Sequence, residues 1–287
     1  MQQQKSFQKE SGNLYLVPTP IGNLEDMTFR GVRTLEEVDI IASEDTRHTQ
    51  KLLNHFSITT PQISLHEHNY KERIPQLIAR LEEGANMAQV SDAGMPSISD
   101  PGHELVEACI ERGIPVIALP GASAGITALI ASGLTAQPFL FYGFLPRKQG
   151  EAIQTLEVLK PIESTLIFYE SPKRLASTFA LVEKVWGGQR RCVLCRELTK
   201  RYEEYTRGTV QELLAYTQEN EIKGECCLLF EGYQKEVEMI SLEEVDWKQE
   251  VEKKMAEEQI SSKVAIKQVA KQYGVKKQDV YQAYHQK

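Results

Sequence analysis

The sequence has few cysteines, and their spacing forms no framework. Five cysteines among 287 residues are an odd number in a long chain, which argues against a disulfide scaffold and favours a reducing compartment. Cys192 and Cys195 have the Cys-x-x-Cys spacing, but they lie in a strand-like run and no second pair accompanies them. Residues at odd spacing on a strand face opposite sides of the sheet. We therefore expect neither a metal nor a redox function for this pair.

The sequence also lacks an apolar segment that could enter a membrane. Its first thirteen residues, MQQQKSFQKESGN, are polar, so we expect no signal peptide. No charged residue lies between Arg112 and Arg147, but prolines and glycines divide this stretch into pieces shorter than the roughly 20 residues of a membrane-spanning helix. We expect a cytoplasmic protein with no membrane partner.

Positive charge is scarce in most of the chain and concentrated at its end. The net charge is −7, which argues against nucleic-acid binding by the chain as a whole. From Ser261 to Lys287, six lysines and one acid give a charge of +5, so the first 260 residues carry −12. This basic end also has two short amphipathic runs, KVAIKQVAKQYG and KKQDVYQAYHQ. Two such helices joined at a glycine are typical of a helix-turn-helix.

The alternation of strand-like and helix-like runs from Leu14 to Gly232 predicts an α/β protein. Up to Leu119 the strands are continuously apolar, a pattern typical of a mostly parallel sheet that is covered on both faces. After Gly121 two neighbouring runs, RCVLCREL and EEYTRG, indicate a hairpin, so we expect a second α/β domain with a mixed sheet. The predicted domains are residues 12–120, residues 121–235 and a helix-turn-helix-like tail at residues 243–287.

Four loops, each predicted to follow a strand, combine small residues with glycine or proline. They are TPIGNLED, SEDTRHT, SDAGMPSISDPG and LPGASAG. Ligands of open α/β sheets bind at the carboxyl ends of the strands, where glycine lets the backbone approach a ligand closely. None of the four has the lysine or the Gly-x-Gly-x-x-Gly of the usual nucleotide loops, and Asp92 suits a neutral or cationic group. Each loop alone could be an ordinary turn, but four together favour a shared pocket.

Two motifs place charged side chains next to strand ends. Glu44, Asp45 and Arg47 in SEDTRHT could serve as proton acceptor and phosphate anchor, or could form only a helix N-cap with a local ion pair. Lys173 lies at a helix start in YESPKRL, where a cation is unfavourable, so it indicates either an anionic partner or a solvated side chain. His66 and His68 have no third ligand nearby in the sequence, and we expect no metal site.

Several motifs occur in a fixed order between Leu14 and Gly232. They are LYLVPTPIGNLEDMTFRGVRTLEEVDIIASEDTRHTQKLL, SDAGMPSISDPG, ALPGASAGITAL, FYGFLPRK and FYESPKRL. Together they resemble the ribosomal RNA small-subunit methyltransferase I family, which are cytidine 2′-O-methyltransferases of the tetrapyrrole-methylase superfamily. The tail resembles that family's helix-turn-helix appendage. The resemblance implies two α/β domains with S-adenosylmethionine bound in a cleft between them. It also implies a homodimer in the bacterial cytoplasm, with small-subunit (16S) ribosomal RNA, free or in the assembled subunit, as substrate.

The resemblance also carries the superfamily's cofactor loops onto this sequence. The Gly-Gly-Asp loop corresponds to Asp92, Ala93 and Gly94, but here the acid comes first and an extra residue follows, a departure that argues against a tetrapyrrole substrate. The last strand, GECCLLFEG, is implied to border the adenine. The implied cofactor-binding residues are Pro20, Ile21, Gly22, Asp92, Ala93, Gly94, Ser97, Ile98, Pro120, Gly121, Ser123, Ala124, Tyr169, Glu170, Gly224 and Glu225.

The implied reaction is attack of a ribose hydroxyl on the methyl carbon, with the reacting atoms held near contact and without a metal. We expect Glu44 or Asp45 to accept or orient the hydroxyl proton, while Arg47 and Lys173 hold the flanking phosphates. The alternative is that positioning alone suffices and that these residues only cap helices.

Two other functions stay open at this point. One is methylation of a tetrapyrrole or another small molecule, and the other is a DNA-binding regulator with a ligand-sensing α/β body. The basic tail argues against the first, because a small-molecule enzyme has no need of it. The tail's small share of the chain argues against the second. A macromolecular RNA substrate accounts for both body and tail.

Overall fold

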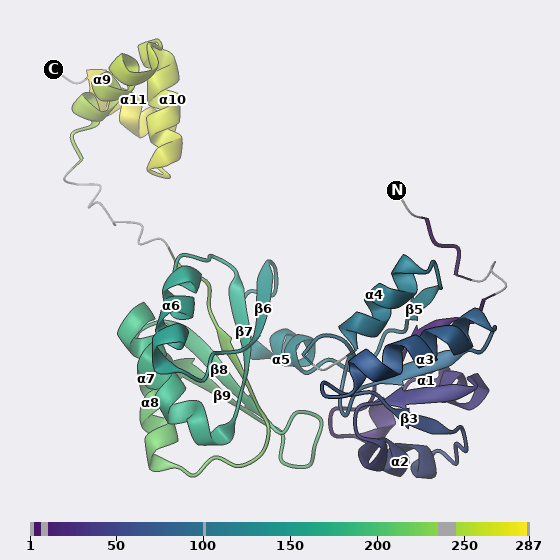
Figure 1. The fold of residues 1–287 in the computed structure, drawn as a ribbon. Coiled ribbons are helices and arrows are strands. Elements are labelled where there is room, and N and C mark those ends of the chain that lie inside the picture. The colour runs from purple at the N-terminus through teal and green to yellow at the C-terminus, as the bar shows by residue number, and fades with distance from the viewer. Residues whose placement is uncertain (1–2, 7–10, 100–101, 235–244, 286–287) are drawn as a thin grey trace. The chain divides into compact units, whose positions relative to one another are not determined.

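The computed structural model describes residues 3–6, 11–99, 102–234 and 245–285. They fall into two units, Met1–Tyr233 and Gln234–Lys287, and each is described by itself (Figure 1). Within these described residues, no helix is long and apolar enough to cross a lipid bilayer.

The first half of the larger unit contains a five-stranded parallel sheet with the order β3-β2-β4-β1-β5. Its elements are β1 (Leu14–Leu16), η1 (Leu24–Asp26), α1 (Phe29–Glu37), β2 (Ile40–Ser43), α2 (Thr46–His55), β3 (Gln62–Ser64), α3 (Tyr70–Glu82), β4 (Met87–Val90), α4 (His103–Glu111) and β5 (Val116–Ala118). All residues of β2 and β4 are buried. Alternate residues of β2 pack into different apolar clusters, Ile40 and Ala42 in one and Ile41 in the other. Helices therefore cover both faces, as the continuous apolar strands predict.

The second half of the larger unit contains a mixed five-stranded sheet with the order β6-β7-β10-β8-β9. Its elements are α5 (Ala124–Ser132), β6 (Phe139–Phe144), α6 (Gln149–Leu159), β7 (Thr165–Glu170), η2 (Pro172–Arg174), α7 (Leu175–Trp186), β8 (Arg191–Arg196), β9 (Glu204–Thr209), α8 (Val210–Glu219) and β10 (Cys226–Phe230). Strands β6 and β7 are parallel and the other pairs are antiparallel. The expected hairpin of β8 and β9 is present.

The two faces of the mixed sheet have different coverings. Helices α6, α7 and α8 lie on one face, and α5 lies on the other (Figure 1). Phe168 and Leu228 pack into the cluster under the three helices, whereas Ile167 and Leu229 pack with Leu129 of α5. Because α5 is short, it leaves part of its face of the sheet free to form the wall of a pocket.

The smaller unit is a three-helix cluster formed by α9 (Trp247–Glu258), α10 (Ser262–Gln272) and α11 (Lys277–His285). Val251, Ile266, Val269 and Val280 form its buried core. Gly274, with φ +65°, ends the turn after α10, as the helix-turn-helix pattern predicts. The expected fold class is thereby confirmed. We keep the limits 12–120, 121–235 and 243–287 as a proposal, and residues 235 and 243 lie outside the described residues.

Candidate functional site

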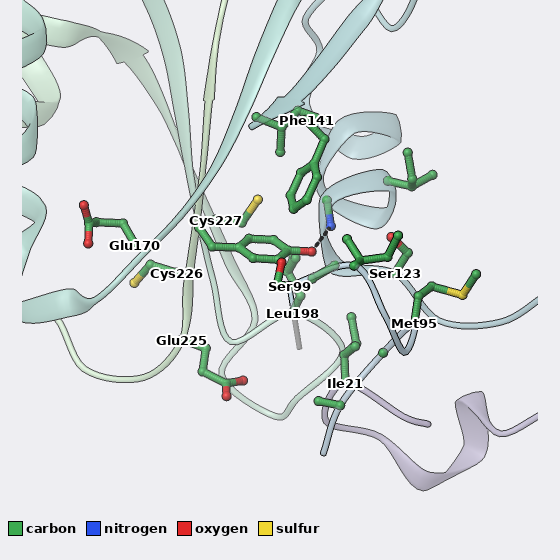
Figure 2. Close-up of a pocket in the computed structure, with 18 of the residues that line it drawn as sticks. Ile21, Met95, Ser99, Ser123, Phe141, Glu170, Leu198, Glu225, Cys226 and Cys227 are labelled. Carbon is green, nitrogen blue, oxygen red and sulfur yellow. Dashed lines mark hydrogen bonds between the residues drawn. The ribbon is translucent and has the colours of Figure 1, made fainter. Parts of the chain in front are cut away.

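A pocket of about 790 Å³ lies between the loops of the parallel sheet and the α5 face of the mixed sheet. Its volume falls within the roughly 300–1,000 Å³ range of small-molecule and cofactor sites. Figure 2 shows Ile21 and Met95, from the loops of the first half, facing Cys227 of β10, which packs in the same apolar cluster as Ile21. The pocket therefore lies at the carboxyl ends of the parallel strands, where the sequence predicts a shared site.

Backbone hydrogen bonds join the loops that follow β1 and β4. The N–H of Thr19 donates to the carbonyl of Gly94 at 3.0 Å, and the N–H of Gly94 donates back to the carbonyl of Thr19 at 2.9 Å. The Thr19 hydroxyl donates to the carbonyl of Ser91 at 3.1 Å. Gly94 has φ +76°, a conformation that favours glycine. The two loops thus form one rigid part of the pocket wall.

The loop after β5 depends on a close backbone approach. A Cβ atom added to Gly121 would lie 2.6 Å from Cβ of Pro18, far inside normal contact distance. Glycine at this position lets the chain pass over the β1 loop. Pro120 and Ser123 reach the pocket on either side of it.

Aromatic side chains of the mixed sheet form the opposite wall. The ring centroid of Tyr169 lies 4.9 Å from that of Phe141 and 5.6 Å from that of Phe144, and both pairs meet edge to face. The Tyr169 hydroxyl accepts a hydrogen bond from the N–H of Gly125 at 3.1 Å, drawn as the dashed line in Figure 2. This bond occupies an N–H in the first turn of α5 that has no partner within the helix. It fixes the start of α5 against β7.

The carboxylate of Glu170 faces the layer of helices and not the pocket. Strand residues alternate between faces, so Tyr169 points into the pocket and Glu170 points away from Ile21 and Met95 (Figure 2). The buried carboxylate accepts hydrogen bonds from the Thr178 hydroxyl at 2.7 Å and the Ser171 N–H at 2.8 Å. It also pairs with Nε of Arg174 at 3.4 Å.

Among the described residues, no lysine, arginine or histidine lines the pocket. Glu225, at its edge, pairs with Lys200 at 2.8 Å, and Lys200 also pairs with Glu197 at 2.9 Å. The Glu225 N–H and the Lys200 ammonium lower the pKa of Glu197. A site without cations is unsuited to a polyphosphate and suits a neutral or positively charged ligand.

Twelve of the implied cofactor-binding residues line this pocket. They are Ile21, Ala93, Gly94, Ile98, Pro120, Gly121, Ser123, Ala124, Tyr169, Glu170, Gly224 and Glu225. The other four, Pro20, Gly22, Asp92 and Ser97, are not in the lining. Gly22 lies so close to Lys200 that an added Cβ would be 2.4 Å from its Cγ, and Ser97 accepts from the Gln89 amide at 2.8 Å. Cofactor binding by all sixteen stays a prediction.

The four expected catalytic residues lie outside the pocket lining. Asp45 caps α2 by accepting from the Arg47 N–H at 2.8 Å, and its two oxygens also bind the guanidinium at 3.1 and 2.8 Å. Arg47 lowers the pKa of Asp45. These contacts are those of the capping alternative. Glu44 accepts from the N–H of Asp92 at 3.4 Å, next to the pocket residue Ala93, and exposed Lys173 follows the pocket residue Pro172.

Twelve further lining residues were missed by the sequence motifs. Cys226 and Cys227 had a signal, because their strand was implied to border the adenine, and Phe141 and Phe144 lie in an aromatic run. Met95 and Ser99 lie in a loop that the motifs did identify. The missed residues are Met95, Ser99, Gly125, Ile126, Phe141, Phe144, Ile167, Ser171, Pro172, Leu198, Cys226 and Cys227.

In the described part of the chain, no group of three or more histidine, cysteine or acidic side chains could hold a metal ion. The backbone N–H of His68 donates to Nδ1 of His66 at 3.2 Å.

Burial raises the pKa of Cys192 and of Cys195 to about 12, so both thiols stay protonated at neutral pH.

Comparison with known proteins identifies the family of this chain. Residues 13–214 match the family described as Tetrapyrrole (Corrin/Porphyrin) Methylases. The chain is 55% identical to ribosomal RNA small subunit methyltransferase I of Streptococcus pyogenes serotype M3 over 99% of each chain. It is 48% identical to the Bacillus subtilis protein of the same name, again over 99% of each.

A solved structure has the same fold. A uroporphyrin-III C-methyltransferase from Thermus thermophilus, complexed with S-adenosylhomocysteine, superposes with a TM-score of 0.55 at 16% identity, covering 77% of this chain and 97% of that one. At that identity the likeness shows the fold alone. The full-length identity to the bacterial relatives confirms the resemblance seen in the motifs: the chain belongs to the ribosomal RNA small subunit methyltransferase I family of the tetrapyrrole methylases.

Proposed function

We propose that this chain transfers a methyl group from S-adenosylmethionine to the 2′-hydroxyl of a cytidine in 16S ribosomal RNA. The observation that carries the proposal is the 55% identity over 99% of the chain to a ribosomal RNA small subunit methyltransferase I. Family membership makes the chain a methyltransferase enzyme, and the position of the methylated atom follows from the motif resemblance.

The pocket residues fit S-adenosylmethionine. The pocket has the volume of a cofactor site, and none of the described residues that line it has a cationic side chain that would oppose the positive charge of a sulfonium. Gly94 and Gly121 let the backbone come close to a ligand. We assign the loops at Ala93–Gly94 and 120–123 to the methionine part and the start of β10 to the adenine. When bound, the cofactor supplies an electrophilic methyl group.

The protein's own part of the reaction is to position the ribose hydroxyl and accept its proton. A hydroxyl is a weak nucleophile unless a base assists it. Of the two candidate carboxylates, we propose Glu44, because both oxygens of Asp45 are engaged by Arg47 and the lowered pKa of Asp45 makes it a weaker base. Asp45 and Arg47 then fix the start of α2, and Arg47 and Lys173 remain proposed phosphate contacts.

We propose that the smaller unit binds the RNA. Lys263, Lys267, Lys271, Lys276 and Lys277 are all exposed on it, while the rest of the chain is acidic. Removal of residues 243–287 is expected to preserve affinity for S-adenosylmethionine, to weaken binding of the small subunit and to reduce the salt dependence of binding. Full methylation rates with an unchanged salt slope would contradict this role.

We also propose that the chain acts as a homodimer in the cytoplasm. Ile130 of α5 is 77% exposed and Phe139 of the edge strand β6 is 42% exposed, and a second copy would remove such apolar surface from water. Light scattering should give twice the chain mass for the wild type and a smaller mass for Ile130→Glu. A monomeric wild type would contradict the proposal.

The activity is tested with purified protein, isotopically labelled S-adenosylmethionine and three substrates. These are small subunits from cells that lack the gene, naked 16S RNA from the same cells, and uroporphyrinogen III. Nuclease digestion followed by chromatography of the nucleosides should show label in 2′-O-methylcytidine. Label in the tetrapyrrole would replace the proposal with the small-molecule alternative, and label in a base rather than a ribose would contradict the proposed 2′-hydroxyl acceptor.

A further inference from the structure

Strand β6 contains a bulge that directs two phenylalanines to the same side of the sheet. Phe141 pairs with Ile167 and Gly143 with Phe168, so Tyr142 is the extra residue. Gly143 has φ +86°, which glycine adopts without strain. In a regular strand, residues three apart face opposite surfaces. Here both Phe141 and Phe144 line the pocket, which is the re-aiming effect of a bulge beside a functional site.

Phe144 differs from the rest of the aromatic wall in its exposure. Its side chain is 57% exposed, whereas Ile167, in the middle of the same wall, is fully buried. Phe144 contacts Tyr169 by an edge, with the ring planes at 65°, so the ring is supported but not covered. A large aromatic ring at the mouth of a pocket offers a flat apolar surface of the kind that stacks on a nucleobase.

Two cations lie in the turns that follow β6, the strand of Phe144, and its neighbour β7. Arg147 comes three residues after Phe144, and Lys173 comes directly after the pocket residue Pro172. Because β6 and β7 are parallel neighbours, their carboxyl ends lie at the same edge of the sheet. Among the described residues, neither cation forms an ion pair, whereas the neighbouring Lys148 pairs with Glu151 at 2.9 Å.

A half-buried arginine, Arg174, ties the two turns together. The guanidinium of Arg174 donates to the carbonyls of Leu145, at 3.4 Å, and Pro146, at 3.1 Å, and its Nε lies 3.4 Å from the buried Glu170 carboxylate. Glu170 and Arg174 therefore hold the turn that carries Arg147 against the turn that carries Lys173. A fixed spacing between two cations suits a rigid ligand with two anionic groups.

We infer that Phe144, Arg147 and Lys173 form a nucleotide subsite of the RNA substrate. Phe144 stacks against an unpaired base, and Arg147 and Lys173 bind the phosphates on either side of that nucleotide. The cation-free pocket interior keeps phosphates at the rim, where the two cations are. Single-stranded RNA is recognised in this way, by stacking unpaired bases on aromatic rings and by contacts to the backbone. The inference rests on the proposed RNA methyltransferase function.

Single-turnover methylation of small subunits, measured at several subunit concentrations, tests the stacking contact. Phe144→Ala should raise the half-saturating subunit concentration by about tenfold to a hundredfold, with the affinity for S-adenosylmethionine, measured by calorimetry, within about twofold of wild type. Phe144→Tyr should restore binding, since it keeps the ring. Tyr142→Ala is the matched control, because Tyr142 lies on the same strand but packs against Phe168 and Thr155.

The phosphate contacts are tested through the salt dependence of subunit binding. Log affinity falls as log salt concentration rises, and the double variant Arg147→Ala, Lys173→Ala should make this slope shallower by about 1–2 units. Each lost phosphate contact removes roughly 0.7–0.9 from the magnitude of the slope. The control double variant Lys160→Ala, Lys184→Ala removes two exposed lysines at the other ends of α6 and α7 and should leave the slope unchanged.

Three results would overturn the subsite. One is a wild type that methylates subunits while the variants match their controls. Another is a loss of cofactor affinity in Phe144→Ala as large as its loss of rate, which would place the ring on the cofactor. The third, a wild type that binds S-adenosylmethionine but methylates neither subunits nor 16S RNA, would remove the proposed function together with the subsite. The melting temperature of each variant is measured beside its rate, so that a loss of activity caused by unfolding is recognised.

Discussion

The two halves of the larger unit contribute different parts of themselves to the pocket. The parallel-sheet half contributes loops of small residues such as Gly94 and Gly121, held by hydrogen bonds between backbone atoms. The mixed-sheet half contributes large side chains, with Phe141, Phe144 and Tyr169 forming one wall. A cofactor between them would meet backbone on one side and aromatic surface on the other. In the first half, we therefore expect cofactor binding to be weakened by substitutions that add a side chain to a glycine. In the second half, we expect it to be weakened by substitutions that remove side-chain atoms from the aromatic wall.

The largest expected effect tests whether the first half also supplies a catalytic side chain. Glu44→Gln should lower the single-turnover rate by a factor on the order of a hundred while cofactor affinity is kept, because a proton acceptor is lost. Asp45→Asn should keep a rate near that of the wild type, since Asp45 is engaged by Arg47. If both variants keep near-normal rates, positioning alone drives the reaction, and the first half supplies only backbone.

A side chain added to a pocket loop of the first half should have the next largest effect, on the affinity for S-adenosylmethionine. Gly94→Val forces a branched residue into φ +76° and brings its Cβ to 3.3 Å from Ile21. Strain of this kind costs about 1–3 kcal/mol, and the loop can relieve it by leaving the conformation that forms the pocket wall. Because binding requires the loop to return, affinity for S-adenosylmethionine should fall about tenfold to a hundredfold. Calorimetry measures it, with Gly150→Val as control, because a Cβ at Gly150 meets open space. Unchanged affinity in Gly94→Val would remove this loop from the site.

A single hydroxyl removed from the second half should have a smaller effect. Tyr169→Phe leaves the ring in the wall but takes away the acceptor for the Gly125 N–H. A lost hydrogen bond of about 0.5–1.5 kcal/mol corresponds to a threefold to tenfold loss of cofactor affinity. Tyr216→Phe, which removes a hydroxyl that contacts Glu204 outside the pocket, should bind as the wild type does. Equal affinities for the two variants would show that the start of α5 is held by other contacts.

The smallest effect concerns the pH dependence of the exposed Asp45–Arg47 pair. The pair lowers the pKa of Asp45 in the folded protein. Its contribution to stability is therefore fully present above the unfolded pKa of about 3.9 and is lost as pH falls below that value. The melting temperatures of wild type and Asp45→Asn should differ by a constant few degrees from pH 5 to 7, and the difference should shrink steadily below about pH 4 as the pH approaches the lowered pKa of Asp45 in the folded protein. A gap that widens towards low pH would show that the pair does not act as an N-cap.

Parts of the molecule with local signals could be predicted from the sequence. Continuous apolar strands such as Ile40–Ser43 can be buried only inside a covered sheet, and this gave the parallel half. The four glycine- and proline-containing loops follow strands, and parallel strands end at one edge, which gave the position of the pocket. The start of the helix Val210–Glu219 also has a local signal, because Thr209 and Glu212 form a capping box.

Other parts depend on register or on contacts between distant residues, and the sequence could not show them. Phe144 reaches the pocket only because a bulge shifts β6 against β7, and a bulge depends on pairing with another strand. The turn of the Glu170 carboxylate towards Thr178 depends on which face of β7 the helices cover. The roles of Glu44, Asp45, Arg47 and Lys173 in catalysis stay a prediction, because a catalytic role depends on where the ribose binds, and a local sequence motif does not specify that position.

Mass mapping of small-subunit RNA from cells that lack this protein tests the central claim most directly. The account predicts that one ribose methyl group, on a cytidine, is missing, that the wild-type gene restores it, and that a gene carrying Gly94→Val restores less of it. An identical set of modifications in cells with and without the protein would contradict the account.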